Sequence, residues 1–304
     1  MRASIVVPLL LLGLATPIAA GEPEPMSAAD AYALPQPDPG LRVRYGDEPR
    51  QFGELRLPAG SGPFPVAVVI HGGCWLADYD GAYMGAFSEA VTALGFATWS
   101  VGYRRVGEDG GGWPNTFRDV GDAADHLRLL AEHHPLDLSR VLAVGHSAGG
   151  HLALWLAGRD SIGATSPLYD REPLAIGGVL GLAAAADLAF LAERGDCENA
   201  ATRLMAGGPD TRPARYAEGS PLARPAKIPQ ILVNGALDEQ WSAPANRYLN
   251  AAAAAGAPVE RRIAPASGHF EPVVPGSVGW PTTRRALLDL LARVDAAKPD
   301  PVAP

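Results

Sequence analysis

The segment Gly145-His146-Ser147-Ala148-Gly149 matches the pattern G-x-S-x-G, which presents a nucleophilic serine in many hydrolases. It follows an apolar run and precedes a helical pattern, so it is predicted to lie where a strand turns into a helix. Such a turn is tight, and the flanking glycines leave room for it. We therefore predict that Ser147 attacks the carbonyl carbon of an ester or amide.

The base that activates this serine is predicted to be His269. A serine hydroxyl is a weak nucleophile and needs a base within hydrogen-bond reach. In folds with this motif, the acid and then the histidine follow the serine along the chain. His269 is the one histidine after residue 153, and it sits in a short loop beyond an apolar run. His146 and His151 lie close to the serine in sequence, and we expect them to point elsewhere.

The acid that orients this imidazole is predicted to be Asp238. It follows an apolar run at 231–233, which places it in a loop at the carboxyl end of a strand. Ser242 is expected to cap the next helix, so Asp238 is free to bind the histidine. The other candidates are Glu239 and, less favoured, Asp187 and Asp210.

Donors for a tetrahedral oxyanion are expected in the His-Gly-Gly-Cys-Trp loop at 71–75, which follows an early apolar run. Its two glycines let the backbone approach a ligand. The second source of donors is the residue after the nucleophile. We assign the oxyanion hole to the backbone N–H groups of Gly73, Cys74 and Ala148. His71 is expected to brace the loop and not to react.

Apolar runs and helical patterns alternate along the chain, which is typical of a layered α/β fold with a mostly parallel sheet. The runs are continuously apolar, as expected of strands that are buried on both faces. A hairpin at the sheet edge is predicted over 42–56. The predicted strands are 64–70, 96–101, 141–144, 176–182, 231–233 and 259–263, and the predicted helices are 84–94, 117–131, 148–156, 245–255 and 283–294.

One interval, 183–227, interrupts this alternation with short helical pieces and many glycines, prolines and charges. Insertions after parallel strands lie over the carboxyl ends of the sheet, where ligands bind. We therefore predict a small cap at 183–227 within a single domain at 41–296. An extended lead-in is expected at 21–40 and a loose tail at 297–304.

The first twenty residues have the order of a cleavable export signal. Arg2 precedes a mostly apolar run at 5–15, and the small pair Ala19-Ala20 precedes a polar, proline-rich stretch. Cleavage is expected after Ala20. The run is shorter than the ~20 residues that a membrane span needs, so no stable anchor is expected after cleavage. The protein is thus predicted to be exported, and to be periplasmic or secreted.

Composition narrows the range of partners. The formal net charge is −8 and the chain has no block rich in Lys and Arg, which argues against nucleic acid as a partner. Two cysteines are present, Cys74 and Cys197, and they lack the spacing of a metal site. An exported protein can pair them. Because nothing in the sequence brings them within bonding range, we favour two free thiols over a disulfide.

Several motifs together resemble α/β-hydrolase esterases related to kynurenine formamidase and, more distantly, hormone-sensitive-lipase-like enzymes. The resemblance implies an α/β-hydrolase fold, no cofactor, no metal and the three residues predicted above as a catalytic triad. Cys74 stands where the His-Gly-Gly-Gly form of the loop has its third glycine, which changes the pocket wall but keeps a backbone donor. Arg104 and Asp119 look like a structural ion pair. The matching pieces are 71–75, 103–107, 111–114, 145–151, 235–238 and 268–270.

The sequence is compatible with three functions. The favoured one is an exported serine esterase that cleaves short or medium carboxylic esters through an acyl-enzyme. The alternative is an arylformamidase that hydrolyses N-formylkynurenine with the same residues, which the export signal disfavours. The third, a catalytically silent binding protein, is disfavoured because serine, acid and histidine are all present.

The partner is expected to be a small-molecule ester or amide. Aromatic residues next to the motif loops are the candidates for substrate binding. No long apolar lid helix is evident in the predicted cap, so fats are not the expected substrates. The proposed substrate-binding residues are Trp75, Trp241 and Phe270.

Overall fold

An eight-stranded sheet forms the centre of the protein, in the order β1-β2-β4-β3-β5-β6-β7-β8. The computed structural model describes residues 24–298; the predicted export signal at 1–20 and residues 299–304 of the predicted tail lie outside the described residues. β1 and β2 form the expected antiparallel hairpin at one edge, and β2 also pairs antiparallel with β4. All further neighbours pair in parallel, so the predicted mostly parallel sheet is confirmed.

The strands lie close to the predicted positions. β3 is buried along almost its whole length, which its unbroken apolar sequence predicts. The prediction missed the first residues of β5, because 136–140 alternates apolar and polar residues and so lacks a continuous apolar run. The strand bounds are β1 Leu41–Arg44, β2 Phe52–Arg56, β3 Phe64–Ile70, β4 Ala97–Val101, β5 Leu136–His146, β6 Gly178–Leu182, β7 Gln230–Gly235 and β8 Val259–Ala264.

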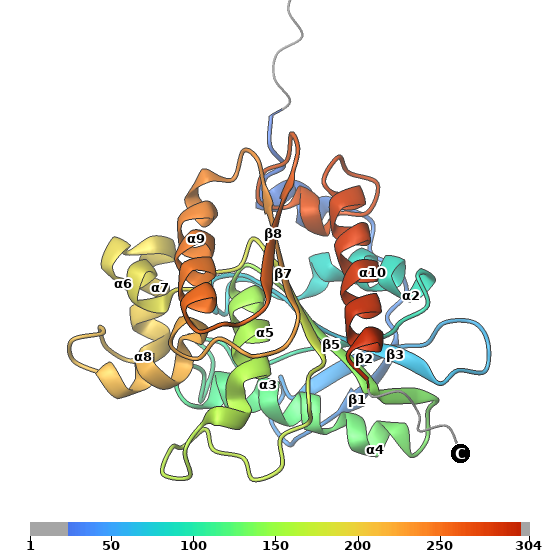
Figure 1. Ribbon diagram of the computed structural model, residues 1–304, viewed down its shortest axis with the longest axis horizontal. Helices are drawn as coiled ribbons and strands as arrows, with labels where there is room; N and C mark the ends of the chain where they lie inside the picture. Colours follow the sequence, from blue (N-terminus) through green and yellow to red (C-terminus); the bar gives the residue numbers. More distant parts are fainter. Residues whose placement is uncertain (1–23, 299–304) are drawn as a thin grey trace, which may run out of the picture.

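Helices cover both faces of the sheet (Figure 1). On one face α2 and α10 pack a cluster of buried apolar side chains against the strands. On the other face α3, α5 and α9 pack a larger cluster that extends to the cap helices. The helices of these layers are α2 Gly85–Ala93, α3 Asn115–Asp125, α4 Leu127–Ala131, α5 Ala148–Gly158, α9 Glu239–Ala254 and α10 Trp280–Ala296.

Two helices differ from prediction. The pattern over 117–131 forms α3 and α4, which meet at His126. Helix α9 begins at Glu239, not at 245, so Ser242 lies inside it and is not its cap. Among the described residues, 24–298, no helix has the length and apolar character needed to cross a membrane.

The interval between β6 and β7, where a cap is predicted at 183–227, contains three helices, and we call it the cap after that prediction. It holds α6 (Leu188–Arg194), α7 (Asp196–Met205) and α8 (Pro213–Gly219). The predicted extended lead-in is wrong in one respect, because it contains the short helix α1 (Ala28–Ala33). Ser27 and Asp30 form a capping box that starts this helix, in which each side chain accepts a hydrogen bond from the other residue's backbone N–H.

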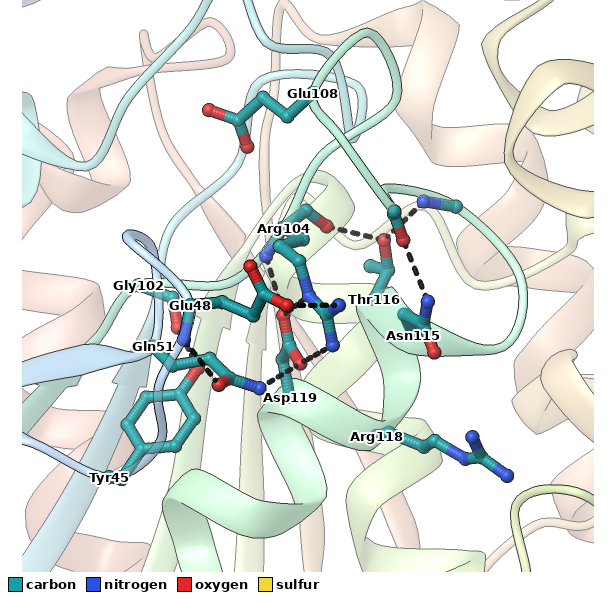
Figure 2. A network of polar contacts seen from close by, with 12 residues as sticks. Tyr45, Glu48, Gln51, Gly102, Arg104, Glu108, Asn115, Thr116, Arg118 and Asp119 are labelled. Atoms are coloured by element: carbon teal, nitrogen blue, oxygen red, sulfur yellow. Dashed lines mark hydrogen bonds and ion pairs between the residues drawn. The ribbon is translucent and has the colours of Figure 1, made fainter.

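A buried ion pair joins α3 to the loop after β4 (Figure 2). Asp119 is fully buried and receives N–H bonds from the Arg104 side chain, with Nη2 2.7 Å from Oδ1 and Nε 2.9 Å from Oδ2. The backbone N–H of Arg104 and the Gln51 amide also donate to this carboxylate. The expected ion pair is therefore confirmed, and it fixes the β1–β2 hairpin and the β4 loop to one helix.

This pair predicts a large stability difference between two similar arginine contacts. Arg104→Ala leaves a buried carboxylate without its cation and should lower the free energy of unfolding by about 3–5 kcal/mol. Arg42 also binds a carboxylate at 2.7 Å, that of Glu54, but 60% of its side chain is exposed. Arg42→Ala should therefore cost less than about 1 kcal/mol. Urea unfolding measures both, and equal losses would contradict the structural role of Arg104.

Candidate active site

Ser147 stands at a strained turn between β5 and α5. Its backbone has φ 54° and ψ −118°, a conformation that L-residues rarely adopt. A Cβ at position 145 would collide with the carbonyl of Gly149, and one at 149 would collide with the carbonyl of Ile70. Only glycine fits these positions, so the flanking glycines make the turn possible. The serine is 3% exposed and lines a pocket of about 220 Å³.

His269 and Asp238 meet from two different loops. The Nδ1 atom of His269 lies 2.8 Å from Oδ2 of Asp238. Because a carboxylate only accepts, Nδ1 carries the proton and Nε2 presents a lone pair. His269 and Ser147 line the same pocket. The structure thus brings together the three residues predicted as nucleophile, base and acid.

Asp238 occupies the position that caps α9, yet its side chain makes no capping bond. The carboxylate turns to His269 instead, and the hydroxyl of Ser242 donates to the Asp238 carbonyl at 3.0 Å. Glu239, the alternative acid, is exposed on the first turn of α9. Of the less favoured candidates, Asp187 binds Arg247 and Asp210 is exposed.

The loop at 71–75, which we call the oxyanion loop after its predicted role, follows β3 in a run of left-handed backbone. Gly73 has φ 100°, Cys74 φ 52° and Trp75 φ 57°. Gly73 and Cys74 line the pocket with Ser147. The N–H of Gly72 is already bonded to the Tyr83 hydroxyl, at 2.7 Å, and is therefore occupied. Since the first N–H groups of a helix have no intrahelical acceptor, the N–H of Ala148 at the start of α5 is open to a ligand.

The predicted substrate-binding residues divide into two groups. Trp241 and Phe270 line the pocket and pack on the catalytic histidine candidate, with ring centroids 5.2 Å from that of His269. Trp75 is different: it is 2% exposed, does not line the pocket and packs its ring against His151. The left-handed backbone after Cys74 turns Trp75 into the core, so the expectation that it binds substrate is wrong.

Cys74 and Cys197 form a disulfide, so the prediction of two free thiols is wrong. Their Cα atoms are 6.2 Å apart although 123 residues separate them in sequence. Sequence spacing carries no information about such proximity, which depends on where the cap settles. The bond ties the oxyanion loop to α7, and both cysteines line the pocket. Among residues 24–298 no group of three or more His, Cys, Asp or Glu could hold a metal ion.

A buried network that sequence reasoning missed connects these loops. The Tyr83 hydroxyl accepts from Gly72 N–H and lies 2.7 Å from Nδ1 of His146. Nε2 of His146 lies 3.0 Å from the carbonyl of His269. This carbonyl accepts, so Nε2 carries the proton and Nδ1 receives the Tyr83 hydroxyl hydrogen. His146 therefore points to the site, contrary to expectation, and links the oxyanion loop to the His269 loop.

The network requires a neutral His146. Burial holds the pKa of His146 well below its ordinary value, and the neighbouring His269 lowers it further. Protonation would give His146 a second N–H where the Tyr83 hydroxyl now donates. No sequence pattern marks Tyr83 as a partner, because its contact to His146 arises only when the segment after the oxyanion loop folds over the nucleophile turn.

Comparison with known proteins assigns the family. Residues 54–251 match the model of the BD-FAE family, which comprises α/β-hydrolase-type esterases. The chain belongs to this family, and we class it as a carboxylic ester hydrolase. Among curated proteins no sequence match reaches significance. The relation to kynurenine formamidase that the motifs suggest is not confirmed.

Solved structures of esterases share the fold at low sequence identity. Esterase B from Lactobacillus rhamnosis, in complex with a C6-C4 inhibitor, has a TM-score of 0.73 at 21% identity, covering 88% of this chain and 91% of its own. A truncated carbohydrate esterase from gut microbiota has a TM-score of 0.71 at 18% identity, covering 84% and 95%. Est2 from Thermogutta terrifontis, with propionate bound, has a TM-score of 0.68 at 18% identity, covering 86% and 97%.

The acid assignment predicts a contrast between adjacent carboxylates. Asp238→Asn keeps the shape of the side chain but removes the charge that orients the histidine, and kcat should fall by about ten-thousand-fold. Glu239→Gln alters an exposed side chain and should change kcat by no more than about twofold. Steady-state hydrolysis of p-nitrophenyl acetate measures both. The reverse order of effects would assign the acid to Glu239.

Buried neutral histidines predict acid sensitivity of the fold. Burial lowers the pKa of His71 and that of His151 to about 4. Unfolded histidine titrates near ~6.5, so the unfolded chain takes up protons first as the pH falls. The free energy of unfolding should therefore drop between about pH 6.5 and 4, by about 2 kcal/mol per histidine at about pH 5.

Urea unfolding at about pH 7.5 and about pH 5 tests this acid sensitivity. His151→Asn removes one titrating group and should reduce the pH dependence. His133→Gln changes an exposed histidine and should leave it unchanged. Equal stability of the wild-type protein at both pH values would contradict the prediction.

Proposed function

We propose that the protein is an exported serine esterase in which Ser147, His269 and Asp238 form the catalytic triad. The observation that carries this proposal is the Asp238–His269 hydrogen bond beside a serine held on a strained turn in the same pocket. This is the arrangement that nucleophilic catalysis of acyl transfer needs: a nucleophile, a base and a group that orients the base.

The proposed reaction has two halves. Ser147 Oγ attacks the ester carbonyl while Nε2 of His269 takes the hydroxyl proton. The oxyanion accepts bonds from backbone N–H groups of Gly73, Cys74 and Ala148. Collapse expels the alcohol, which takes the proton from His269, and leaves an ester on the serine. Water then attacks this acyl-enzyme, gives its proton to His269, and the carboxylic acid leaves as the proton returns to Oγ.

Short acyl groups fit this pocket best. Its volume of about 220 Å³ is small, and aromatic rings, including those of Trp241 and Phe270, form part of its wall. The cap contributes short helices and one pocket residue, Cys197, and not a long apolar channel. Structural relatives support the same range: one is described with a tributyrin phosphonate inhibitor, and another as an acetyl ester-xyloside hydrolase.

Export is the proposed location. The predicted signal at 1–20 supports it, and so does the Cys74–Cys197 disulfide, because such bonds persist in oxidising compartments. An arylformamidase is not favoured, since the structural relatives are described as esterases. A silent binding protein is disfavoured by the complete arrangement of nucleophile, base and acid.

Ser147→Ala is the direct test of the proposed mechanism. The residues of a triad act as a unit, so kcat for p-nitrophenyl acetate should fall by about a million-fold. Labelling by a fluorophosphonate should disappear in the same variant, while circular dichroism should match the wild type. Substantial remaining esterase activity with an intact fold would show that another residue is the nucleophile.

Acyl chain length should decide the rate. Each methylene that the pocket buries contributes ~0.8 kcal/mol, but a pocket of about 220 Å³ is too small to bury a long chain. We expect p-nitrophenyl acetate or butyrate to have a far higher kcat/KM than the palmitate ester, with no activation at a lipid–water interface. Comparable efficiency on palmitate, or a rise in rate above its solubility limit, would indicate a lipase.

A further inference from the structure

The segment at 26–32, which we call the N-terminal segment, forms one wall of the candidate active site. Ala28 and Tyr32 lie one helical turn apart on α1, and both line the pocket that holds Ser147 and His269. The family match begins at residue 54, so this wall lies outside the part of the chain that the BD-FAE model covers. It is therefore a feature on which substrate selection by this particular chain can depend.

A buried carboxylate holds the segment in place. Oε1 of Glu271 accepts the N–H of Met26 at 2.7 Å, and Oε2 accepts the N–H of Gly268 at 2.8 Å. Glu271 is 6% exposed. Hydrogen bonds from backbone N–H groups to a buried carboxylate are strong because the acceptor is charged. One side chain thus fixes both the start of α1 and the loop that carries His269.

Tyr32 is fixed at the other end of the segment. Its hydroxyl donates to the carbonyl of Asp80 at 2.7 Å. Its ring lies 5.2 Å from that of Tyr83, between centroids. Burial raises the pKa of Tyr32, so the phenol stays neutral at all ordinary pH values. The ring is anchored to the segment after the oxyanion loop, where Tyr79 and Tyr83 also face the pocket.

We propose that Tyr32 is a specificity-determining residue, whose ring limits the bulk of the ester group that enters the pocket. The proposal rests on the proposed esterase function. Two hydrogen bonds fix the position of the ring. The Tyr32 hydroxyl donates to the carbonyl of Asp80, and Glu271 holds the backbone just before α1, the helix that carries Tyr32. The ring therefore acts as a fixed wall and not as a side chain that yields to a larger substrate.

Two ester series test this role. In one the alcohol is p-nitrophenol and the acyl group grows from acetyl to butyryl to octanoyl; in the other the acyl group is acetyl and the alcohol grows from methyl to phenyl to naphthyl. Tyr32→Ala should raise kcat/KM for the bulkiest relative to the smallest ester by about tenfold or more in at least one series. Tyr32→Trp should shift the same ratio in the opposite direction.

Two further variants serve as controls. Tyr32→Phe keeps the ring and its contact with Tyr83 but loses the bond to Asp80, so its selectivity should fall between that of the wild type and that of Tyr32→Ala. Tyr169→Ala removes an exposed tyrosine that does not line the pocket and should leave both series unchanged. Because Tyr32→Trp reports in the opposite sense, the test does not depend on Tyr32→Ala folding well.

The outcomes separate the two proposals. A wild-type protein without activity on any of these esters overturns the proposed function. An active wild type whose selectivity is the same in the folded Tyr32→Ala and Tyr32→Trp variants overturns the role of Tyr32 and leaves the proposed function standing. Opposite shifts in the two variants support the role of Tyr32.

Discussion

The left-handed backbone at Ser147 is the constraint around which the rest of the site is arranged. A strained residue persists only where the surroundings hold it, and here β5 and α5 enter and leave the turn through glycines that allow close backbone approach. The parallel sheet then places the loops after β3, β7 and β8 at the same edge as this turn. The pocket follows from that topology, because each loop brings one chemical group.

Buried polar contacts fix the positions of these loops relative to one another. Tyr83 and His146 connect the oxyanion loop to the His269 loop, and Glu271 connects the His269 loop to the N-terminal segment. The disulfide adds a covalent link between the oxyanion loop and the cap. The site is therefore assembled by contacts between segments that are distant in sequence. Removing one of these contacts is expected to shift the other loops as well.

The sequence was informative where signals are local and uninformative where they are not. Ser147 could be predicted from a local signal, the strand–turn–helix context of its motif. Asp238 and His269 could be predicted from their order along the chain after the serine. The structure brings these three residues together. The prediction that Trp75 binds substrate was wrong because the backbone at Cys74 and Trp75 is left-handed, which only the folded loop reveals. The disulfide and the pocket wall at Tyr32 depend on long-range packing, so spacing and composition gave no sign of them.

The identity of the nucleophile can be tested most directly by the structure of a covalent adduct. The protein is treated with a short alkyl fluorophosphonate, and the modified residue is located by peptide mass spectrometry and by crystallography. We expect one adduct, on Oγ of Ser147, with the phosphonyl oxygen within hydrogen-bond distance of backbone N–H groups of Gly73 or Cys74 and of Ala148. An adduct on another residue, or inhibition of ester hydrolysis without modification of Ser147, would contradict it.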